Sequence, residues 1–542
     1  MASLAYALSG PNLVTFNLAN PASPTSSVII TGLLGGQTLV GIDIRPQNGL
    51  LYGFGVDPVA DVGTLYTIST TTGVATIVGS IVSLDLHASD YGFDFNPAVD
   101  RIRVTTAGGE NFRINPNNGS LTGDDTNIVG AAISGVAYTN NQPVTTVTTL
   151  YTLDSITDQL MIQNGNQGTQ TPVGPTGVDF SNANGFDIAA GVNASVSGGV
   201  APGFGSALLT VGGVVGLYTI NLATGAATLV GPFLGPNPVN GFTLQNEGVP
   251  FDFNGDRKAD ILWQNDDGTP AVWLLDGTNV SAFGAVLPDP GPAWHAIDSA
   301  DFNRDGRSDI LWQNNDGTAS VWLMNGTNVA SFGAVLPNPG PTWHAKEAAD
   351  FNADGRADIL WQNNDGTASV WLMDGTNVAA VGAVLPNPGP TWHVKDAADF
   401  NADGKADILW QNDNGAASVW LMDGTNVLAF GAVLPNPGPT WHTVASGDFN
   451  ADGRADILWQ NDDGTPAVWL MNGTNVLAFG AVLSNPGPSW HAKEAEDTNG
   501  DGKADILWQN NDGTPAVWLM DGTTVAAFGP TLPDPGASWH IV

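Results

Sequence analysis

A segment of the form DFNxDGxxDILWQN returns every 49 residues, and this repetition constrains the fold more than any other feature of the chain. The copies have no insertions or deletions between them. They begin at Asp252, Asp301, Asp350, Asp399, Asp448 and Asp497. Each copy must pack against its neighbours, because one short unit cannot bury its apolar side chains alone. The second half of the chain is therefore predicted to be a repeat domain.

A change in composition marks the boundary of this domain. All 18 Trp residues lie in the repeats, three to a copy, and none precedes residue 246. A chain of 542 residues is also too long for one ordinary domain. We predict two domains, residues 1–245 and 246–542, with a linker near Gln245-Asn246-Glu247-Gly248.

Each repeat contains short apolar segments separated by turn and breaker residues. In the third copy the predicted strands are 357–362, 368–373, 377–385 and 392–398. Asp365-Gly366 favours a tight turn, and the Pro-rich segment 386–390 cannot pair inside a sheet. Four strands per 40–50 residues are typical of a β-propeller blade. A β-solenoid is the alternative, although its coils are usually shorter.

The two ends of the repeat region predict how such a ring would close. Residues 539–542 (WHIV) align with residues 294–297 (WHAI), but no acidic loop follows them. The last strand could therefore complete the first blade. This gives six blades, or seven if residues 240–251 contribute further strands.

The first half repeats more loosely. A Gly-apolar-x-apolar strand starts at Gly41, Gly92, Gly135, Gly185 and Gly241. Five such strands predict about five blades, the fifth closing with the strands after Leu4. Neither half has a long segment of helical periodicity. The predicted fold class is all-β, with two tandem β-propellers.

Charge and composition exclude several classes of partner. The chain has 52 acidic and 15 basic residues, a formal net charge of -37. Such a surface repels nucleic acids and anionic lipids, so neither is an expected partner. No apolar run is long enough for a membrane span. Because Cys is absent, thiolate metal sites and Cys nucleophiles are excluded as well.

The acidic loop that opens each repeat predicts a metal site. In the third copy Asp350, Asn352 and Asp354 occupy loop positions 1, 3 and 5, Gly355 occupies position 6, and Asp358 occupies position 9. Calcium prefers six to eight oxygen ligands, whereas magnesium tends to keep its waters. Alternate side chains of a tight loop can supply these oxygens, and Gly permits the bend. We therefore expect up to six calcium ions.

Two features limit this prediction. An EF-hand needs a bidentate Glu at position 12, but Trp361 stands there inside a predicted strand, so the Asp at position 9 must close the site. The first copy departs from the others, with Gly255 at position 4 and Arg257 at position 6. The alternative interpretation is an Asx-rich turn without metal.

The predicted metal ligands are the Asp, Asn, Asp and Asp at positions 1, 3, 5 and 9 of each copy. They are Asp252, Asn254, Asp256, Asp260, Asp301, Asn303, Asp305, Asp309, Asp350, Asn352, Asp354, Asp358, Asp399, Asn401, Asp403, Asp407, Asp448, Asn450, Asp452, Asp456, Asp497, Asn499, Asp501 and Asp505.

On these loops, residues 252–542 resemble the FG-GAP repeats of integrin α-subunit propellers and the related VCBS-type repeats of bacterial surface and secreted proteins. The resemblance implies that the loops hold calcium as a structural ion and that the protein is secreted or lies at the cell surface. Fungal lectins of this family bind sugars between blades, which implies a possible glycan site. The first half resembles a bacterial extracellular domain family of unknown function through strands such as 64–68 (TLYTI) and 75–79 (ATIVG).

The aromatic residues are the candidates for sugar contact. We predict that the first two Trp of each copy pack between blades. The third Trp, beside the Pro-rich segment, is closer to an edge, although packing is the favoured interpretation here too. These ligand candidates are Trp294, Trp343, Trp392, Trp441, Trp490 and Trp539. The His that follows each of them is predicted to bond to a neighbouring blade.

Three hypotheses about function follow. The leading one is a non-catalytic recognition protein that binds a glycan or an extracellular protein. The second is a self-assembling structural subunit of a surface layer, filament or matrix, stabilised by calcium. The third is a hydrolase in the first half, where Asp43, Asp94 and Asp187 either line a channel or cap turns; no common catalytic motif supports it.

Overall fold

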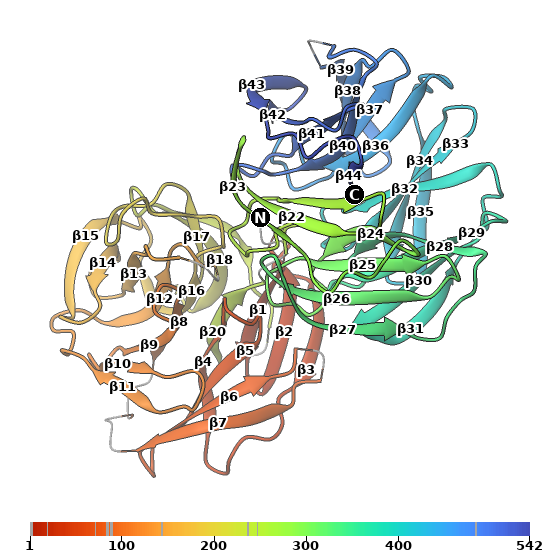
Figure 1. Ribbon diagram of the computed structural model, residues 1–542. Helices are drawn as coiled ribbons and strands as arrows, with labels where there is room; N and C mark the ends of the chain where they lie inside the picture. The colour runs from red at the N-terminus through yellow and green to blue at the C-terminus, as the bar shows by residue number, and fades with distance from the viewer. Residues whose placement is uncertain are drawn as a thin grey trace. The chain divides into compact units, whose positions relative to one another are not determined.

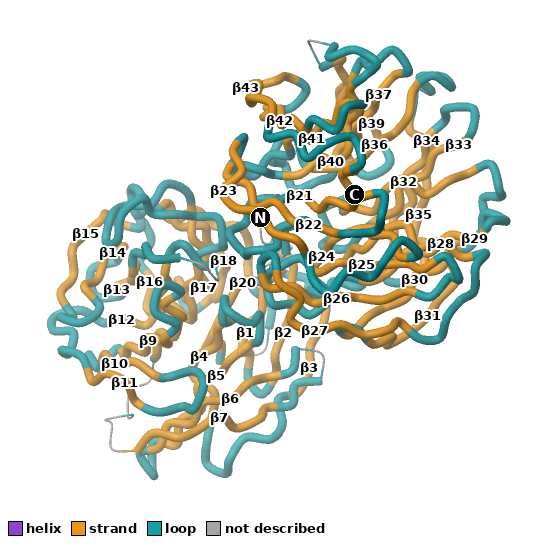
Figure 2. Tube along the Cα trace, viewed as in Figure 1, coloured by secondary structure: helices purple, strands orange, loops and turns teal. Residues whose placement is uncertain are grey.

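The computed structural model describes residues 4–18, 20–70, 72–82, 86, 90–142, 145–235, 238–245, 248–482 and 485–542. These residues form 44 β-strands joined by loops and no helix (Figures 1 and 2). They accordingly include no helix with the length and apolarity of a membrane span. The chain divides into two compact units, Met1–Glu247 and Gly248–Val542. Asn246 and Glu247 of the expected linker lie outside the described residues.

The first unit consists of five antiparallel sheets of four strands each. In hydrogen-bonded order they are β20 (Val239–Leu244), β1 (Leu4–Ser9), β2 (Asn12–Asn17), β3 (Pro24–Ile29); β4 (Thr38–Ile44), β5 (Leu51–Asp57), β6 (Val62–Ile68), β7 (Ala75–Val82); β8 (Tyr91–Asn96), β9 (Arg101–Thr106), β10 (Asn111–Ile114), β11 (Leu121–Asp124); β12 (Ile133–Tyr138), β13 (Leu150–Asp154), β14 (Gln159–Asn164), β15 (Thr169–Pro175); and β16 (Phe180–Asp187), β17 (Phe204–Val211), β18 (Val214–Asn221), β19 (Ala227–Pro232).

The first strand of each of these sheets is an inner strand. Strands β4, β8, β12, β16 and β20 contact one another in that order, and β20 also contacts β4. Strand β20 pairs with β1 near the start of the chain, placing Tyr6 opposite Thr243. The hydrophobic core lies between neighbouring sheets, where Phe54 of one packs against Phe93 and Phe112 of the next.

The second unit consists of six antiparallel sheets of four strands, numbered here as sheets 1 to 6. In hydrogen-bonded order they are β44 (Trp539–Ile541), β21 (Ile261–Asn265), β22 (Pro270–Asp276), β23 (Asn279–Ala285); β24 (Trp294–Ala300), β25 (Asp309–Asn314), β26 (Ala319–Asn325), β27 (Asn328–Val335); β28 (Trp343–Ala349), β29 (Asp358–Asn363), β30 (Ala368–Asp374), β31 (Asn377–Val384); β32 (Trp392–Ala398), β33 (Asp407–Asn412), β34 (Ala417–Asp423), β35 (Asn426–Val433); β36 (Trp441–Gly447), β37 (Asp456–Asn461), β38 (Pro466–Asn472), β39 (Asn475–Ala481); and β40 (Trp490–Glu496), β41 (Asp505–Asn510), β42 (Pro515–Asp521), β43 (Thr524–Thr531).

Strand β44, at the end of the chain, belongs to sheet 1, where Ile541 lies opposite Trp263. The Trp-His segment of each repeat is therefore the first strand of the following sheet, since the Pro-rich segment before it interrupts pairing. The backbone also links consecutive repeats, because the N–H of Ala357 donates to the carbonyl of Asp301. The equivalent bond from Ala259 reaches Asp497, joining the last repeat to the first.

The first two Trp of each repeat form the core between sheets. Trp361 is fully buried, and its ring lies 5.1 Å from that of Trp371. Both pack against Leu311 and Val321 of the preceding sheet. The predicted packing role of these residues is therefore confirmed.

Candidate functional site

Each acidic loop folds around its first Asp. The carboxylate of Asp350 accepts the backbone N–H groups of Asn352, Asp354 and Gly355 at 3.1, 3.2 and 2.6 Å. The amide of Asn352 in turn donates to Asp354 at 3.2 Å. The side chains at positions 1, 3 and 5 are therefore held within the loop, where their oxygens accept backbone N–H groups.

The Asp at position 9 has a different environment. Asp358 is fully buried, and its two oxygens accept the N–H groups of Phe351 at 3.0 Å and Met373 at 2.8 Å. It thus ties the loop to strand β30. In the part of the chain that the structure describes, no loop brings three carboxylates within 4.8 Å of one another.

The electrostatics of the loop favour a bound cation. Burial raises the pKa of Asp350 to about 7, and the nearby charge of Asp354 adds to this rise. In the second repeat, Oδ1 of Asn303 is buried without a hydrogen-bond partner, which is costly unless a donor or cation meets it. The basic residue at position 7 does not neutralise the loop interior in the fourth repeat, where Lys405 pairs with Asp423 at 2.6 Å. In the second and fifth repeats, by contrast, the Arg at position 7 lies 3.8 and 3.7 Å from the Asp at position 5. Oxygen atoms of this kind are the ligands that a hard divalent ion prefers.

The first loop keeps the backbone of the others despite its changed residues. Positions 4 and 6 are left-handed in the third repeat, with φ of 59° at Ala353 and 83° at Gly355. In the first repeat φ is 75° at Gly255 and 65° at Arg257. Both loops thus have a left-handed backbone at positions 4 and 6, and they differ in which of these two positions carries Gly.

A pocket opens between sheets 5 and 6, beside one of the candidate sugar-binding Trp residues. Its cavity volume is about 190 Å³. Trp490 is half-buried there, whereas His442 and Asp462 are exposed. The lining residues are His442, Val444, Gln460, Asn461, Asp462, Gly464, Pro488, Trp490 and His491.

The His residues bond within their own sheets, so the predicted bond to a neighbouring blade was wrong. Nε2 of His442 lies 2.8 Å from Oδ1 of Asp462, in the turn after β37. Strand pairing explains this contact, because His442 lies opposite Gln460, two residues before Asp462. The imidazole therefore forms part of the pocket wall.

The first unit contains a buried cluster of three carboxylates. Asp43, Asp94 and Asp187 come from the inner strands β4, β8 and β16, and oxygens of all three lie within 4.8 Å of one another. Each is at most 2% exposed. The hydroxyl of Thr243 on β20 lies 2.8 Å from Asp43 and 3.0 Å from Asp187. The two predicted roles were lining a channel and capping turns. The arrangement agrees better with the first, because the three side chains meet where the inner strands adjoin.

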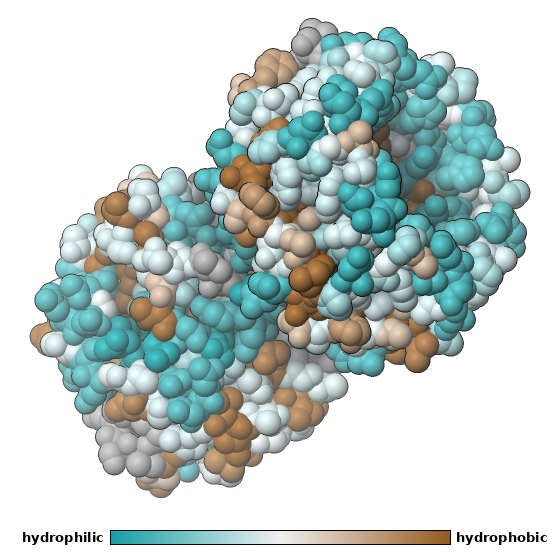
Figure 3. All heavy atoms as spheres, viewed as in Figure 1, coloured by the Kyte–Doolittle hydropathy of each residue, from teal (hydrophilic) through white to brown (hydrophobic). Residues whose placement is uncertain are grey.

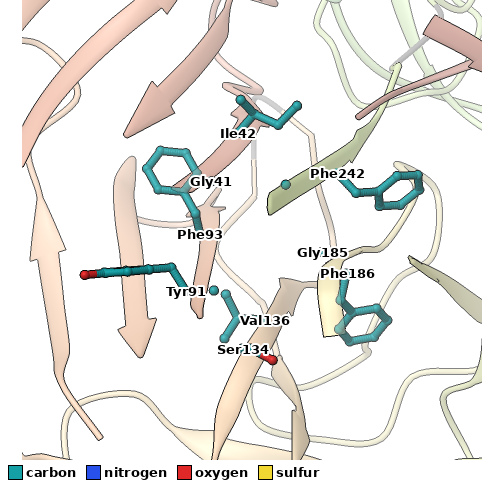
Figure 4. Close-up of a pocket in the computed structure, with 11 residues that line it drawn as sticks. Gly41, Ile42, Tyr91, Phe93, Ser134, Val136, Gly185, Phe186 and Phe242 are labelled. Carbon is teal, nitrogen blue, oxygen red and sulfur yellow. The ribbon is translucent and has the colours of Figure 1, made fainter. Parts of the chain in front are cut away.

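These carboxylates hold the backbone of adjoining inner strands. Asp94 accepts the N–H of Tyr138 at 2.9 Å, and Asp187 accepts that of Leu244 at 2.7 Å. Beside the cluster lies a cavity of about 10 Å³, lined by residues of five inner strands that include Phe93, Val136 and Phe186 (Figure 4). Such a cavity has room for about one water molecule.

Comparison with protein families agrees with this division. Residues 12–243 match a family model described as a domain of unknown function (DUF4394). An FG-GAP-like repeat model matches five overlapping segments, 252–312, 301–361, 350–410, 399–459 and 448–508. The second unit is built from FG-GAP-like repeats. No curated protein matches the chain.

Sequence reasoning missed the Gln that joins neighbouring sheets of the second unit. Nε2 of Gln460 donates to the carbonyl of Trp490 at 2.7 Å, and Oε1 accepts the N–H of Ala492 at 3.2 Å. Its signal in the sequence is a polar residue kept inside an apolar strand in all six copies. The side chain fixes the backbone of Trp490 at the pocket.

Carboxylates on the inner strands of the second unit, the first strand of each sheet (β24, β28, β32, β36 and β40), were missed as well; consecutive members of this series contact one another. Asp298 accepts the N–H of Ala348 in the next sheet at 2.7 Å, and Asp396 accepts bonds from the backbone and hydroxyl of Ser446. Burial raises the pKa of Asp298 to about 7. Both units thus use inner-strand carboxylates to join neighbouring sheets.

Proposed function

We propose that this is a calcium-binding recognition protein, secreted or exposed at the cell surface, which binds carbohydrate without catalysis. The pocket of Trp490 between sheets 5 and 6 is the observation that supports it. It combines the half-buried aromatic ring of Trp490 with exposed hydrogen-bonding groups on His442 and Asp462. Such a combination suits a sugar, which has apolar C–H faces and polar edges.

We further propose that the sheets of each unit close into a β-propeller, five blades in the first unit and six in the second. The pairing of β20 with β1 and of β44 with β21 supports this arrangement. Six repeats would then present six pockets at equivalent positions, with Lys346, Lys395 and Lys493 where Val444 lies in the pocket of Trp490. Weak binding at each would combine into strong attachment to a surface carrying many sugars.

Calcium is proposed to bind at positions 1, 3, 5 and 9 of each loop, with up to six ions per chain. When bound, it neutralises the crowded carboxylates and fixes the loops that link consecutive repeats. Equilibrium dialysis followed by elemental analysis tests this directly. We expect close to six calcium ions per chain, and none retained would refute the proposal.

A glycan array with calcium present tests carbohydrate binding. A sugar that binds there is then titrated by calorimetry against wild type and Trp490→Ala, and the variant is expected to lose one site. Phe479→Ala is the matched control, because Phe479 is an exposed aromatic residue on the outer strand β39. Equal site numbers in Trp490→Ala and wild type would contradict the assignment of the pocket.

Exposed outer strands favour self-assembly as the second candidate function. Hydrophobic residues lie among hydrophilic ones on the visible face of the molecule (Figure 3). One aromatic residue on the outer strand of five FG-GAP-like sheets is more than half exposed, namely Phe283, Phe332, Phe430, Phe479 and Phe528. Unpaired strand edges with such residues promote association. Calcium-dependent polymers without any glycan binding would favour this function.

Catalysis in the first unit has the least support. The three clustered carboxylates are buried and bonded to backbone N–H groups, and the adjoining cavity of about 10 Å³ is too small for a substrate. A glycosidase and esterase screen of the full chain is expected to show no activity.

A further inference from the structure

The basic residue at position 7 of the acidic loops has different partners in different repeats. In the third repeat Nε of Arg356 lies 3.3 Å from Oδ1 of Asp374, the last residue of strand β30. In the fifth repeat Nη1 of Arg454 lies 3.7 Å from Oδ1 of Asp452, which is the Asp at position 5 of the same loop. The basic side chain therefore turns away from the loop in one repeat and toward it in the other.

The loops of these two repeats are identical in sequence, so the difference arises outside them. Residues 350–358 and 448–456 both read DFNADGRAD. Their backbones agree as well, with φ of 59° at position 4 in both loops and of 83° and 82° at position 6. The last residue of the third strand of the sheet, here called the strand-end residue, is Asp374 in the third repeat but Asn472 in the fifth. A neutral amide attracts a guanidinium less than a carboxylate does.

The environment of Arg454 shows which partner it lacks. Its Nε atom is buried and has no hydrogen-bond partner among the described residues. The same atom of Arg356 is the one that contacts Asp374. A buried charged donor without a partner is costly. The vacant position in the fifth repeat is therefore that of the strand-end carboxylate.

The other repeats divide in the same way. Among the described residues, the position-7 side chain lies within 4 Å of the position-5 Asp of its own loop in two repeats, the second and the fifth. These are the two whose strand-end residue is Asn, namely Asn325 and Asn472. In the other four the basic residue pairs with a strand-end Asp at 2.5 to 3.3 Å, in Lys258–Asp276, Arg356–Asp374, Lys405–Asp423 and Lys503–Asp521.

The third and fifth repeats are the closest match in their other charges. Arg257 at position 6 of the first loop and Arg304 at position 4 of the second add a basic residue to those loops, whereas the third and fifth loops contain only the one at position 7. The loop that follows each of these two has a Lys at position 7, paired with its own strand-end Asp at 2.6 Å. The strand-end residue is thus the charge difference next to position 7.

We propose that the strand-end residue sets the calcium affinity of each loop. Asp at this position holds the basic side chain away from the position-5 ligand. Asn leaves an Arg beside that ligand, where its positive charge opposes a divalent cation and occupies a carboxylate that the cation needs. The third, fourth and sixth loops are then tight sites, and the second and fifth are weak ones. This inference rests on the proposed calcium binding and adds a graded response to calcium concentration.

Reciprocal changes in the matched repeats of the full chain test the inference. Asn472→Asp supplies the strand-end carboxylate in the fifth repeat, and Asp374→Asn removes it from the third. The control is Asn414→Asp, which adds the same charge in an exposed turn, at the end of strand β33 far from its acidic loop. The other five repeats have Asp at this turn position. Metal-free protein is titrated with calcium by calorimetry against a competing chelator, and circular dichroism checks that each variant folds.

In wild type we expect two classes of calcium site that differ about tenfold in Kd. Asn472→Asp should move one site from the weak class to the tight class, and Asp374→Asn should move one in the opposite direction. Asn414→Asp should leave both classes unchanged. Arg454→Gln should also tighten one site, and in that background Asn472→Asp should add little, because no Arg remains to be drawn away.

The failures of the two proposals can be told apart. If calcium binds but the reciprocal changes leave its affinities unaltered, the role of the strand-end residue is overturned while calcium binding stands. The same holds if Asn414→Asp tightens binding as much as Asn472→Asp does, since overall charge then explains the effect. If no form of the protein binds calcium, calcium binding and this inference are overturned together.

Discussion

Asp43 accepts the backbone N–H of Phe95 at 2.7 Å, so a carboxylate of one sheet holds the inner strand of the next. Asp94 and Asp187 make equivalent contacts, and the three carboxylates share one buried space. Their hydrogen bonds stabilise the first unit, whereas their mutual repulsion opposes folding when all three are charged. The stability of this unit should therefore depend on their protonation.

We expect the first unit to become less stable as pH rises. Burial raises the pKa of Asp187 to about 6, and burial followed by the charge of Asp187 raises the pKa of Asp43 well above its ordinary value. A carboxyl with a higher pKa in the folded state binds its proton more tightly there, so unfolding becomes easier once the proton is lost. The loss should begin above about pH 4 and amount to about 1.4 kcal/mol per pH unit for each proton retained only by the folded state.

Calorimetry and fluorescence together measure this effect. All seven Tyr residues lie in the first unit and all 18 Trp residues in the second. Trp fluorescence therefore follows the second unit alone, and a calorimetric transition that it does not report belongs to the first. If that transition is unchanged from pH 4 to pH 8, the three carboxylates do not compete for protons in the folded state.

The variant Asp94→Asn should weaken this pH dependence. The amide keeps an oxygen that can accept the N–H of Tyr138 but removes one of the three charges. We expect a higher unfolding temperature than wild type at pH 8 and a flatter profile below it. Asp124→Asn, on the exposed strand β11, is the control and should leave both unchanged.

The sequence predicts the repeats well because each is a local pattern. The turn at Asp365-Gly366, the strand pair after it and the bend at Gly355 depend on neighbouring residues alone. The carboxylate cluster is different, because Asp43 and Asp187 are far apart in the chain and meet only when the inner strands adjoin. The partner of His442 is also a matter of strand register, which periodicity does not specify.

Gln460→Ala should destabilise the second unit. The change leaves the carbonyl of Trp490 and the N–H of Ala492 without their inter-sheet partner, at a cost of about 2–6 kcal/mol for the two groups. Urea unfolding followed by Trp fluorescence measures it, and Asn472→Ala at an exposed position of β38 is the control. Equal stability of the two variants would show that the Gln bridge contributes nothing.

The Trp residues of one repeat should divide into structural and binding groups. Trp361 is fully buried between sheets, so Trp361→Ala should cost about 3–5 kcal/mol in unfolding free energy. Trp392 is half-buried, and Trp392→Ala should cost less while removing one sugar site. Comparing urea unfolding with sugar titration separates the roles. A similar stability loss in both variants would indicate that Trp392 is also a packing residue.

The acidic loop should respond in opposite directions to Asp354→Asn with and without calcium. The side chain adds a negative charge beside buried Asp350, so without calcium its neutralisation should raise the unfolding temperature of the second unit. With calcium, the same change removes a charged ligand and should lower that temperature relative to wild type. An ion that binds only the folded state adds about 2.7 kcal/mol of stability per site at a hundredfold excess over Kd. A loop whose affinity for the ion is weakened would lose part of this contribution. Asp365→Asn, in an exposed turn of the same repeat, should behave as wild type under both conditions. If EDTA leaves the Trp-monitored transition of wild type unchanged, the loops are Asx-rich turns that fold without an ion.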